Sequence, residues 1–291
     1  MLWPHARSRV VADPELAQRL AEGRRKHPES ETWLGLVAAA LAESENDGVW
    51  EAAVPATPAD RPARAPLLHR SRMTVAGRAA RRWVRRLLEL DAPALESLDP
   101  GRLDAVALLE AAVCQDDARV DALATTAGAP ASATPALRVV AQMAALPLLQ
   151  ACGRKLGSEV PSTWWEGYCP MCGAWPTLAE FRGLEHKRWL RCGRCGTGWE
   201  VSWLRCPFCD ETNHENLGYL APGEGEPTRK AEVCDSCKGY VKAESTVRPL
   251  RSWEVLLDDL TTVALDVAAL DRGYHRPERT AYSLEARVVE R

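Results

Sequence analysis

Apolar residues recur at helical spacing along the first half of the chain, up to about residue 157, and predict a set of amphipathic helices. Leu16 and Leu20 share one face of a helix that Asp13 can cap, with Pro14 at its first position. A second helix is expected over residues 31–44, where the apolar positions are Trp33, Leu34, Val37 and Leu41. The N-terminal part is therefore expected to be all-helical.

Further helices are predicted over residues 74–90, over residues 103–123 and from Thr134 onward, the last kinked or broken at Pro147. Between them, prolines at 55, 58, 62 and 66 indicate an exposed connector. The helix at 74–90 carries five arginines, which indicate the solvated side of an amphipathic helix rather than a grip on phosphate or an acidic partner: Arg78, Arg81, Arg82, Arg85 and Arg86.

Near the C-terminus, Ser252 is expected to cap one more helix, with a stripe formed by Leu256, Leu260, Val263, Val267 and Leu270. Asp258, Asp259 and Asp266 lie off that stripe. They fit a partner-facing acidic surface or a favourable interaction with the helix dipole, and the sequence leaves both open. The polar tail after Arg276 is expected to be frayed.

Between these helical parts, eight of the ten cysteines form four Cys-x-x-Cys pairs. Two residues between cysteines let both sulfurs face one ion from a single tight turn, and four such pairs indicate two tetrathiolate metal sites. Gly173 and Gly196, directly after two of the pairs, can adopt positive φ, whereas Asp210 and Lys238 occupy that position in the other two. The candidate ligands are Cys169, Cys172, Cys192, Cys195, Cys206, Cys209, Cys234 and Cys237.

The spacing of the pairs favours joining the first with the second and the third with the fourth, because shorter loop closures cost less entropy. The crossed arrangement, first with third and second with fourth, stays open. Tetrahedral sulfur suits zinc and iron alike, so the metal is iron of the rubredoxin type, about two ions per chain, or zinc. Cys114 and Cys152 are expected to be structural.

Basic and aromatic residues surround the four Cys-x-x-Cys turns, which we call the knuckles. Lys187, Arg188, Arg191, Arg194, Arg205 and Lys238 fit either a solvated hairpin face or a balance to the thiolate charge. Six tryptophans in the same region are expected to pack over the small modules rather than to stack with a ligand: Trp164, Trp165, Trp175, Trp189, Trp199 and Trp203.

The whole chain fits a globular α+β protein of 291 residues, 46% hydrophobic, with a net charge of −3. We expect a helical domain at 1–160, tandem rubredoxin-like or zinc-ribbon modules at 161–250, and a C-terminal helix and tail at 251–291. The acidic balance argues against a nucleic-acid partner. Free thiolates indicate a reducing compartment, and neither a signal peptide nor a membrane-spanning stretch is evident, so a cytoplasmic location is expected.

The succession YCPMCGAWP, RCGRCGTGW, RCPFCD and VCDSCKGYVK, followed by DDLTTVALDVAALDRGY, resembles the formate dehydrogenase accessory protein family, FdhE. The resemblance extends from about Trp164 to Tyr274. It implies a cytoplasmic protein that is needed for active formate dehydrogenase, binds the catalytic subunit before twin-arginine export, and holds iron through the eight cysteines of the Cys-x-x-Cys pairs.

The leading hypothesis is therefore a maturation chaperone and not an enzyme, with the formate dehydrogenase catalytic subunit as partner and dimerisation left open. The sequence contains no phosphate loop, no dinucleotide fingerprint and no convincing Ser/His/Asp set. The alternatives are a metal-thiolate redox protein and a zinc ribbon that binds nucleic acid through the basic run at 187–194.

Overall fold

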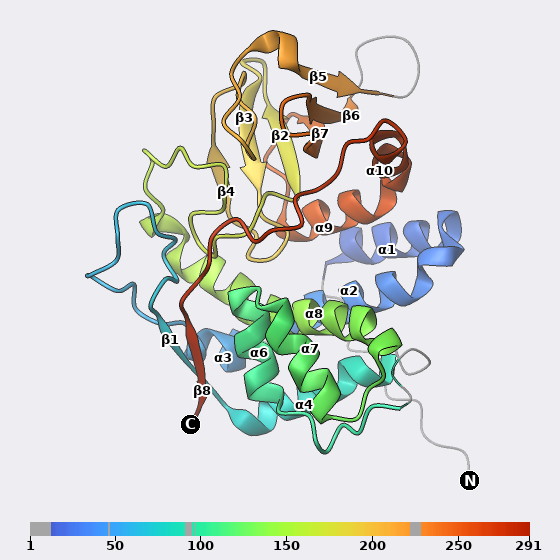
Figure 1. Ribbon diagram of the computed structural model, residues 1–291, viewed down its shortest axis with the longest axis vertical. Helices are drawn as coiled ribbons and strands as arrows, with labels where there is room; N and C mark the ends of the chain where they lie inside the picture. Colours follow the sequence, from blue (N-terminus) through green and yellow to red (C-terminus); the bar gives the residue numbers. More distant parts are fainter. Residues whose placement is uncertain (1–12, 46, 91–94, 96, 222–227) are drawn as a thin grey trace.

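The computed structural model describes residues 13–45, 47–90, 95, 97–221 and 228–291. The N-terminal stretch in which the sequence predicts no signal peptide lies largely outside these residues. The chain first forms a helical layer and then a sheet that lies above it in Figure 1. The helical part consists of α1 (Pro14–Lys26), α2 (Glu31–Ser44), α3 (Asp47–Trp50), α4 (Gly77–Leu90), α6 (Ala105–Cys114), α7 (Asp117–Thr126) and α8 (Thr134–Leu156).

The first two helices agree with the sequence. The Asp13 carboxylate accepts hydrogen bonds from the backbone N–H groups of Glu15 and Leu16, and Leu16 and Leu20 are buried. Helix α2 covers the expected residues, but Trp33 lies about half exposed beside the stripe rather than on it. Caps and spacing therefore set these helices locally, since both act within a few residues.

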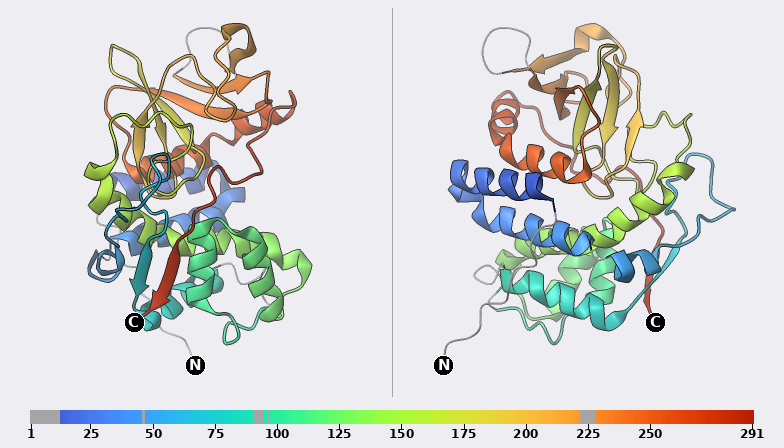
Figure 2. Two further views of the ribbon diagram at one scale, coloured as in Figure 1. Left: turned by 60° about the vertical axis from the view of Figure 1, so that its left-hand side comes forward. Right: turned by 180° about the vertical axis from the view of Figure 1, so that it is seen from behind.

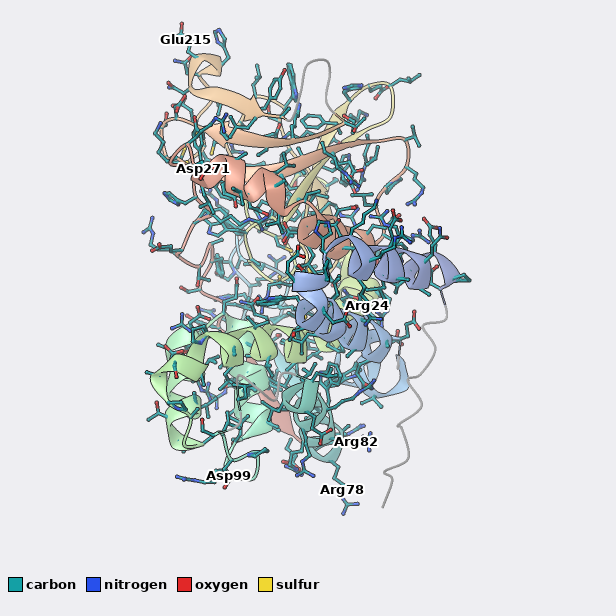
Figure 3. The ribbon with its side chains drawn as sticks, turned by 90° about the vertical axis from the view of Figure 1, so that its right-hand side faces the viewer. Arg24, Arg78, Arg82, Asp99, Glu215 and Asp271 are labelled. Atoms are coloured by element: carbon teal, nitrogen blue, oxygen red, sulfur yellow. The ribbon has the colours of Figure 1, made fainter. Side chains whose placement is uncertain are left out.

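Helix α4 begins three residues later than expected because Thr74 and Val75 belong to strand β1 (Arg72–Val75). The predicted solvated side is confirmed, since Arg78 and Arg82 point away from the protein in Figure 3. Arg81 forms an ion pair with Glu290 near the C-terminus. Four of the five arginines are exposed, and Arg86 is half-buried.

The prediction of a single helix at 103–123 is wrong. The chain forms α6 and α7 instead, because Gln115 adopts a left-handed conformation, with φ of 58°, and ends α6. Asp116 then caps α7 by accepting from the N–H of Arg119. An apolar pattern that runs through a break cannot by itself reveal the break.

Helix α8 is the centre of the helical layer and contacts α2, α4, α6 and α7. Its 23 residues continue past Pro147, so the predicted break does not occur. Of the described residues, the stretch Ala131–Glu159 is long and apolar enough to cross a membrane, but 67% of its most apolar window is buried within the fold. That is the burial of a core helix.

The six-stranded sheet has the order β4-β3-β2-β7-β6-β5. Each Cys-x-x-Cys module supplies three consecutive strands, and the two halves join through β2 and β7, the parallel pair within this sheet. Figure 2 shows from behind that α1 and α9 lie between the sheet and the other helices of the N-terminal part. The strands are β2 (Leu178–Arg182), β3 (Lys187–Arg191), β4 (Gly198–Glu200), β5 (Leu217–Leu220), β6 (Arg229–Cys234) and β7 (Tyr240–Thr246).

The single C-terminal helix predicted by the sequence is two helices, α9 (Ser252–Thr261) and α10 (Val263–Leu270), separated at Thr262. Arg251 rather than Ser252 is the N-cap residue. Because the break changes the helical phase, Leu265 and Ala269 face the sheet. The remainder of the predicted stripe is exposed in α10, at Val263, Val267 and Leu270.

The prediction that the tail is frayed is also wrong. Residues after Arg276 descend from α10 along the side of the protein, and strand β8 (Arg287–Glu290) pairs in parallel with β1 (Figure 1). Leu284, Ala286 and Val288 are buried along this path. A strand partner more than two hundred residues away gives no local sequence pattern.

One hydrophobic core runs from Leu16 through the first four knuckle cysteines to Val288. A second, smaller core joins β6 and β7 to α10 through Val233, Tyr240 and Leu265. The α+β class, with a helical N-terminal part followed by two four-cysteine clusters, is confirmed. The division at residues 160 and 250 stays a prediction.

Candidate metal centres

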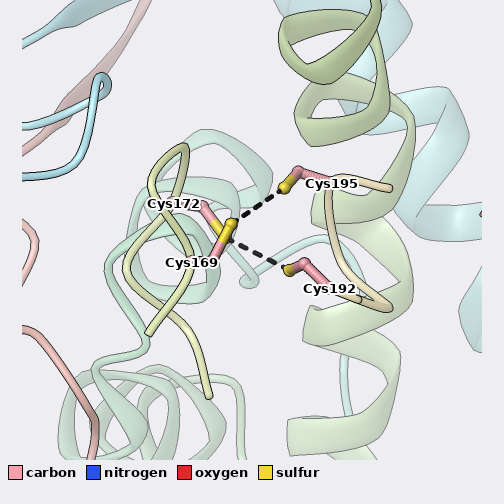
Figure 4. A group of neighbouring side chains, drawn as sticks. All are labelled: Cys169, Cys172, Cys192 and Cys195. Atoms are coloured by element: carbon pink, nitrogen blue, oxygen red, sulfur yellow. Dashed lines mark hydrogen bonds between the residues drawn. The ribbon is translucent and has the colours of Figure 1, made fainter. Parts of the chain in front are cut away.

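The first cluster brings together Cys169, Cys172, Cys192 and Cys195 from two facing turns (Figure 4). The sulfurs of Cys169 and Cys195 lie 3.4 Å apart, and those of Cys172 and Cys192 lie 3.6 Å apart. A tetrahedral ion with metal–sulfur bonds of about 2.3 Å separates its sulfurs by about 3.8 Å. The spacing of the sulfurs therefore fits one tetrahedrally bound ion.

The second cluster has the same arrangement, with 3.7 Å between Cys206 and Cys237 and 3.7 Å between Cys209 and Cys234. All four sulfurs of each cluster lie within 4.8 Å of one another. The sulfurs thus group as first pair with second and third with fourth. This is the adjacent arrangement that the sequence favours, and the crossed one is not formed.

All four knuckles share one backbone turn. The N–H of the first cysteine donates to the carbonyl oxygen five residues later, as in Cys169 to Ala174 and Cys234 to Gly239. The residue after the second cysteine has positive φ in every knuckle, including Asp210 at 64° and Lys238 at 57°. Because this conformation is strained for non-glycine residues, a local glycine preference does not explain the turn in the two knuckles that have Asp210 and Lys238.

Backbone N–H groups also reach the sulfurs in the second cluster. Phe208 N–H donates to the sulfur of Cys206 and Gly239 N–H donates to that of Cys237, both at 3.4 Å. In the first cluster, the Cys195 sulfur lies 3.2 Å from the hydroxyl oxygen of Thr197. Such contacts stabilise negative charge on thiolates.

The pKa values of the thiols explain why the clusters suit a cation. Burial raises the pKa of Cys169 and Cys195 well above the ordinary range, whereas hydrogen bonds from the other three sulfurs lower that of Cys172. Burial also raises the pKa of Cys209 to about 11. Four crowded thiols resist ionising together, and a bound cation removes that obstacle.

The basic residues near the knuckles mostly have acidic partners that the sequence did not indicate. Arg191 pairs with fully buried Glu180 at 2.7 Å, and Arg188 pairs with Glu232 at 2.8 Å. Arg194 donates to the carbonyl oxygen of Ala112, and its charge also favours the thiolate of Cys172. In the second cluster, the hydrogen bond with Asp235 raises the pKa of Lys238, and Cys234 is among the other groups that raise it.

The structural expectation for Cys152 agrees with its position in α8. Its thiol is fully buried, and burial, followed by the charge of Cys172, raises its pKa to about 12. Of the six tryptophans, Trp164 and Trp199 are buried, so the expectation of packing holds for these two. Trp165 instead lies exposed between the guanidinium groups of Arg64 and Arg205.

A cavity of about 160 Å³ adjoins the second cluster, where Cys206 and Cys234 form part of its wall. Trp203 and Tyr219 line it and are 63% and 56% exposed. Lys230 extends over the Tyr219 ring at 5.1 Å. We call this the aromatic pocket, and no sequence pattern predicted it, because its walls come from both modules.

The fold and the two clusters define a class of protein in which a helical domain supports paired four-cysteine modules on one shared sheet. Residues 204–282 match the family described as FdhE, C-terminal domain. An FdhE homolog of Rhizobium meliloti (strain 1021) is 35% identical over 116 residues, which is 38% of this chain and 37% of that protein. One from Pseudomonas aeruginosa is 36% identical over 116 residues, covering 37% of each chain.

The crystal structure of FdhE from Pseudomonas aeruginosa has the same fold, with a TM-score of 0.56 and 24% identity over 93% of this chain and 94% of that one. The sequence alignments themselves span little more than a third of the curated relatives. The resemblance found in the sequence is thus confirmed over the C-terminal part of the chain, which matches the FdhE C-terminal domain, and the chain shares its fold with the FdhE crystal structure.

Proposed function

We propose that the protein is a cytoplasmic accessory protein for the formation of active formate dehydrogenase. It holds the catalytic subunit before export and catalyses no reaction itself. Each four-cysteine cluster binds one ion of iron or zinc, through Cys169, Cys172, Cys192 and Cys195 in the first and Cys206, Cys209, Cys234 and Cys237 in the second. The match of residues 204–282 to the FdhE C-terminal domain and the tetrahedral spacing of the sulfurs support these assignments.

The single observation that carries the client-binding role is the aromatic pocket beside the second cluster. Trp203 and Tyr219 are exposed there, and large exposed aromatics with an adjacent cation are typical of protein interfaces. Most of the lining falls within the stretch that matches the FdhE C-terminal domain. A client side chain of apolar character suits this pocket.

Binding of nucleic acid through the basic run at 187–194 draws little support from the structure. Within the basic run, Arg188 and Arg191 are buried ion-pair partners and Lys187 pairs with Glu185 at 3.0 Å. Phosphate recognition instead needs exposed cations that are available to the backbone of the nucleic acid. The disulfide form of the redox alternative needs two free thiols, whereas each cysteine here is one of four converging sulfurs.

The test is co-purification of the tagged protein with the formate dehydrogenase catalytic subunit from the native host, with metal analysis of the same sample. We expect capture of the subunit and close to two ions of iron or zinc per chain. A purified chain that carries both ions but captures no catalytic subunit under gentle conditions contradicts the accessory role. A chain without metal contradicts the assignment of the cysteines.

A further inference from the structure

The two clusters differ sharply in access. In the first, Cys169, Cys172 and Cys192 have no exposed surface and Cys195 is 2% exposed. In the second, Cys206 and Cys234 are buried, but Cys237 is half-buried and Cys209 is exposed. Two clusters with the same sulfur geometry therefore meet solvent in different ways.

The first cluster is closed by segments from distant parts of the chain. Backbone N–H groups of Leu67 and Leu68 donate to the carbonyls of Pro170 and Met171, at 2.7 and 3.1 Å. On another side α8 packs so closely that a Cβ at Gly153 would collide with the carbonyl oxygen of Cys195. A ligand can reach these sulfurs only after the surrounding core opens.

The second cluster borders a cavity of about 740 Å³ that includes Cys209 and Cys237 in its lining. Trp175 and Phe208 form an edge-to-face pair at its rim, with ring centroids 5.3 Å apart. The Trp175 indole N–H donates to the carbonyl oxygen of Arg279, which holds the segment 277–281 along the same cavity. We call this space the Cys209 cavity.

Four thiolates fill the coordination of a tetrahedral ion, so an incoming ligand must displace one of them, and an exposed thiolate is the accessible one. Since Cys209 combines exposure with a position inside a cavity, it is the ligand that an incoming group meets first. Imidazole and thiolate both bind iron and zinc, and of the two the soft thiolate competes better with the thiolates already bound. The incoming ligand is therefore itself a thiolate, from a small thiol or from a cysteine side chain.

We propose that the second cluster is a site of metal exchange, in which an incoming thiolate displaces Cys209, and that the first cluster is a permanent structural site. This rests on the proposed binding of metal by the cysteines. In the step, one metal–sulfur bond to Cys209 breaks as one to the incoming sulfur forms. The incoming thiol gives up one proton and Cys209 takes one, so the charge of the site and the oxidation state of the metal do not change.

The test uses the full chain loaded with zinc and challenged with glutathione in the presence of a chromophoric zinc chelator. We expect one ion per chain to leave more than about tenfold faster than the other, because release from the first cluster requires opening of the core. Cys209→Ser should lose the fast phase and Cys195→Ser the slow one. Release of both ions at one rate, or a fast phase that survives in Cys209→Ser, overturns the proposal.

Trp175→Ala should speed the fast phase because it removes a side chain that lines the Cys209 cavity and not the aromatic pocket. Trp203→Ala is the matched control, since it removes an aromatic residue of the aromatic pocket, on which Cys206 and Cys234 rather than Cys209 and Cys237 border. Equal effects of the two variants, or none from Trp175→Ala, count against entry through the Cys209 cavity.

A measurement on the unaltered protein avoids variants that fail to fold. Zinc-loaded protein is treated briefly with iodoacetamide, and the modified cysteines are identified by peptide mass spectrometry. We expect Cys209 to be modified first, Cys237 next, and the first cluster to be protected. Modification of the first cluster as fast as Cys209 overturns the proposal.

The source of the thiolate is decided by comparing glutathione with a protein acceptor, apo-metallothionein. Exchange with glutathione alone identifies small thiols as the ligand, and transfer to the protein acceptor without glutathione identifies a cysteine side chain. Two bound ions with equal release rates overturn the exchange role only. A chain that binds no metal overturns the proposed metal sites and the exchange role together.

Discussion

The ammonium nitrogen of Lys242 lies 2.7 Å from the carboxylate of Asp266, and the lysine side chain is only 1% exposed. The same nitrogen contacts Asp259 at 2.8 Å, and Arg276 pairs with both aspartates. Asp258 is buried against Arg19 and Arg229. Asp258, Asp259 and Asp266 therefore pair with cations of the sheet, of α1 and of the tail. The hypothesis that they form a partner-facing acidic surface is wrong.

Lys242→Met should destabilise the fold by about 3 kcal/mol, the lower end of the cost of breaking a buried ion pair, because it leaves two partly buried carboxylates with one cation. The measurement is the urea midpoint of the metal-loaded protein. Lys238→Met is the control, since the Lys238–Asp235 pair is exposed and should contribute less than about 1 kcal/mol. A loss for Lys242→Met no larger than for the control would show that the buried network adds little.

Gly153→Ala should destabilise the protein by about 1–3 kcal/mol or more, because the new methyl group collides with the backbone of Cys195. Bound metal in the first cluster should fall with it. Gly157→Ala is the matched control, because a Cβ there meets nothing within 4 Å. Thermal unfolding with metal analysis checks both, and equal stability of the two variants would contradict the close packing of α8 on the knuckle.

Glu254 gives a pH dependence with a definite sign. Burial raises its pKa, but hydrogen bonds from Arg248 and Arg251 more than offset this, and the pKa falls to about 2 from an ordinary 4.5. A carboxyl with a lowered pKa in the folded state stabilises the protein above pH 4.5, and this contribution is lost as the pH falls toward 2.

The stability difference between the original protein and Glu254→Gln should accordingly be constant near neutral pH and shrink between about pH 4.5 and 2. Urea midpoints of both proteins across this range measure the stability difference. Protonation of the cysteines affects both proteins alike, so it cancels in this difference. A difference that stays constant down to pH 2 would show that the carboxyl is not held in its charged form.

Trp203→Ala and Tyr219→Ala should each weaken capture of the catalytic subunit by about tenfold, since aromatic anchors at interfaces contribute more than about 1 kcal/mol. Leu184→Ala is the control, because Leu184 is fully exposed in the turn between β2 and β3. Binding of the purified subunit is measured by surface plasmon resonance. Unchanged binding by both aromatic variants would move the client contact away from the aromatic pocket.

The sequence by itself determined the features that depend on neighbouring residues. Asp13 and Pro14 start α1 because a cap acts within one turn, and each Cys-x-x-Cys pair forms its own knuckle because the spacing fixes both sulfurs. The adjacent grouping of the pairs followed from loop length, which is also a property of the chain.

Only the tertiary structure decided the features that join distant segments. Strand β8 finds β1, and Lys242 turns the aspartates of α9 and α10 inward, because a buried charge takes its partner from whichever element packs on it. The same reason separates the two clusters. Their Cys-x-x-Cys patterns are alike, but α8, Leu67 and Leu68 cover the first, whereas a cavity borders the second and leaves Cys209 exposed.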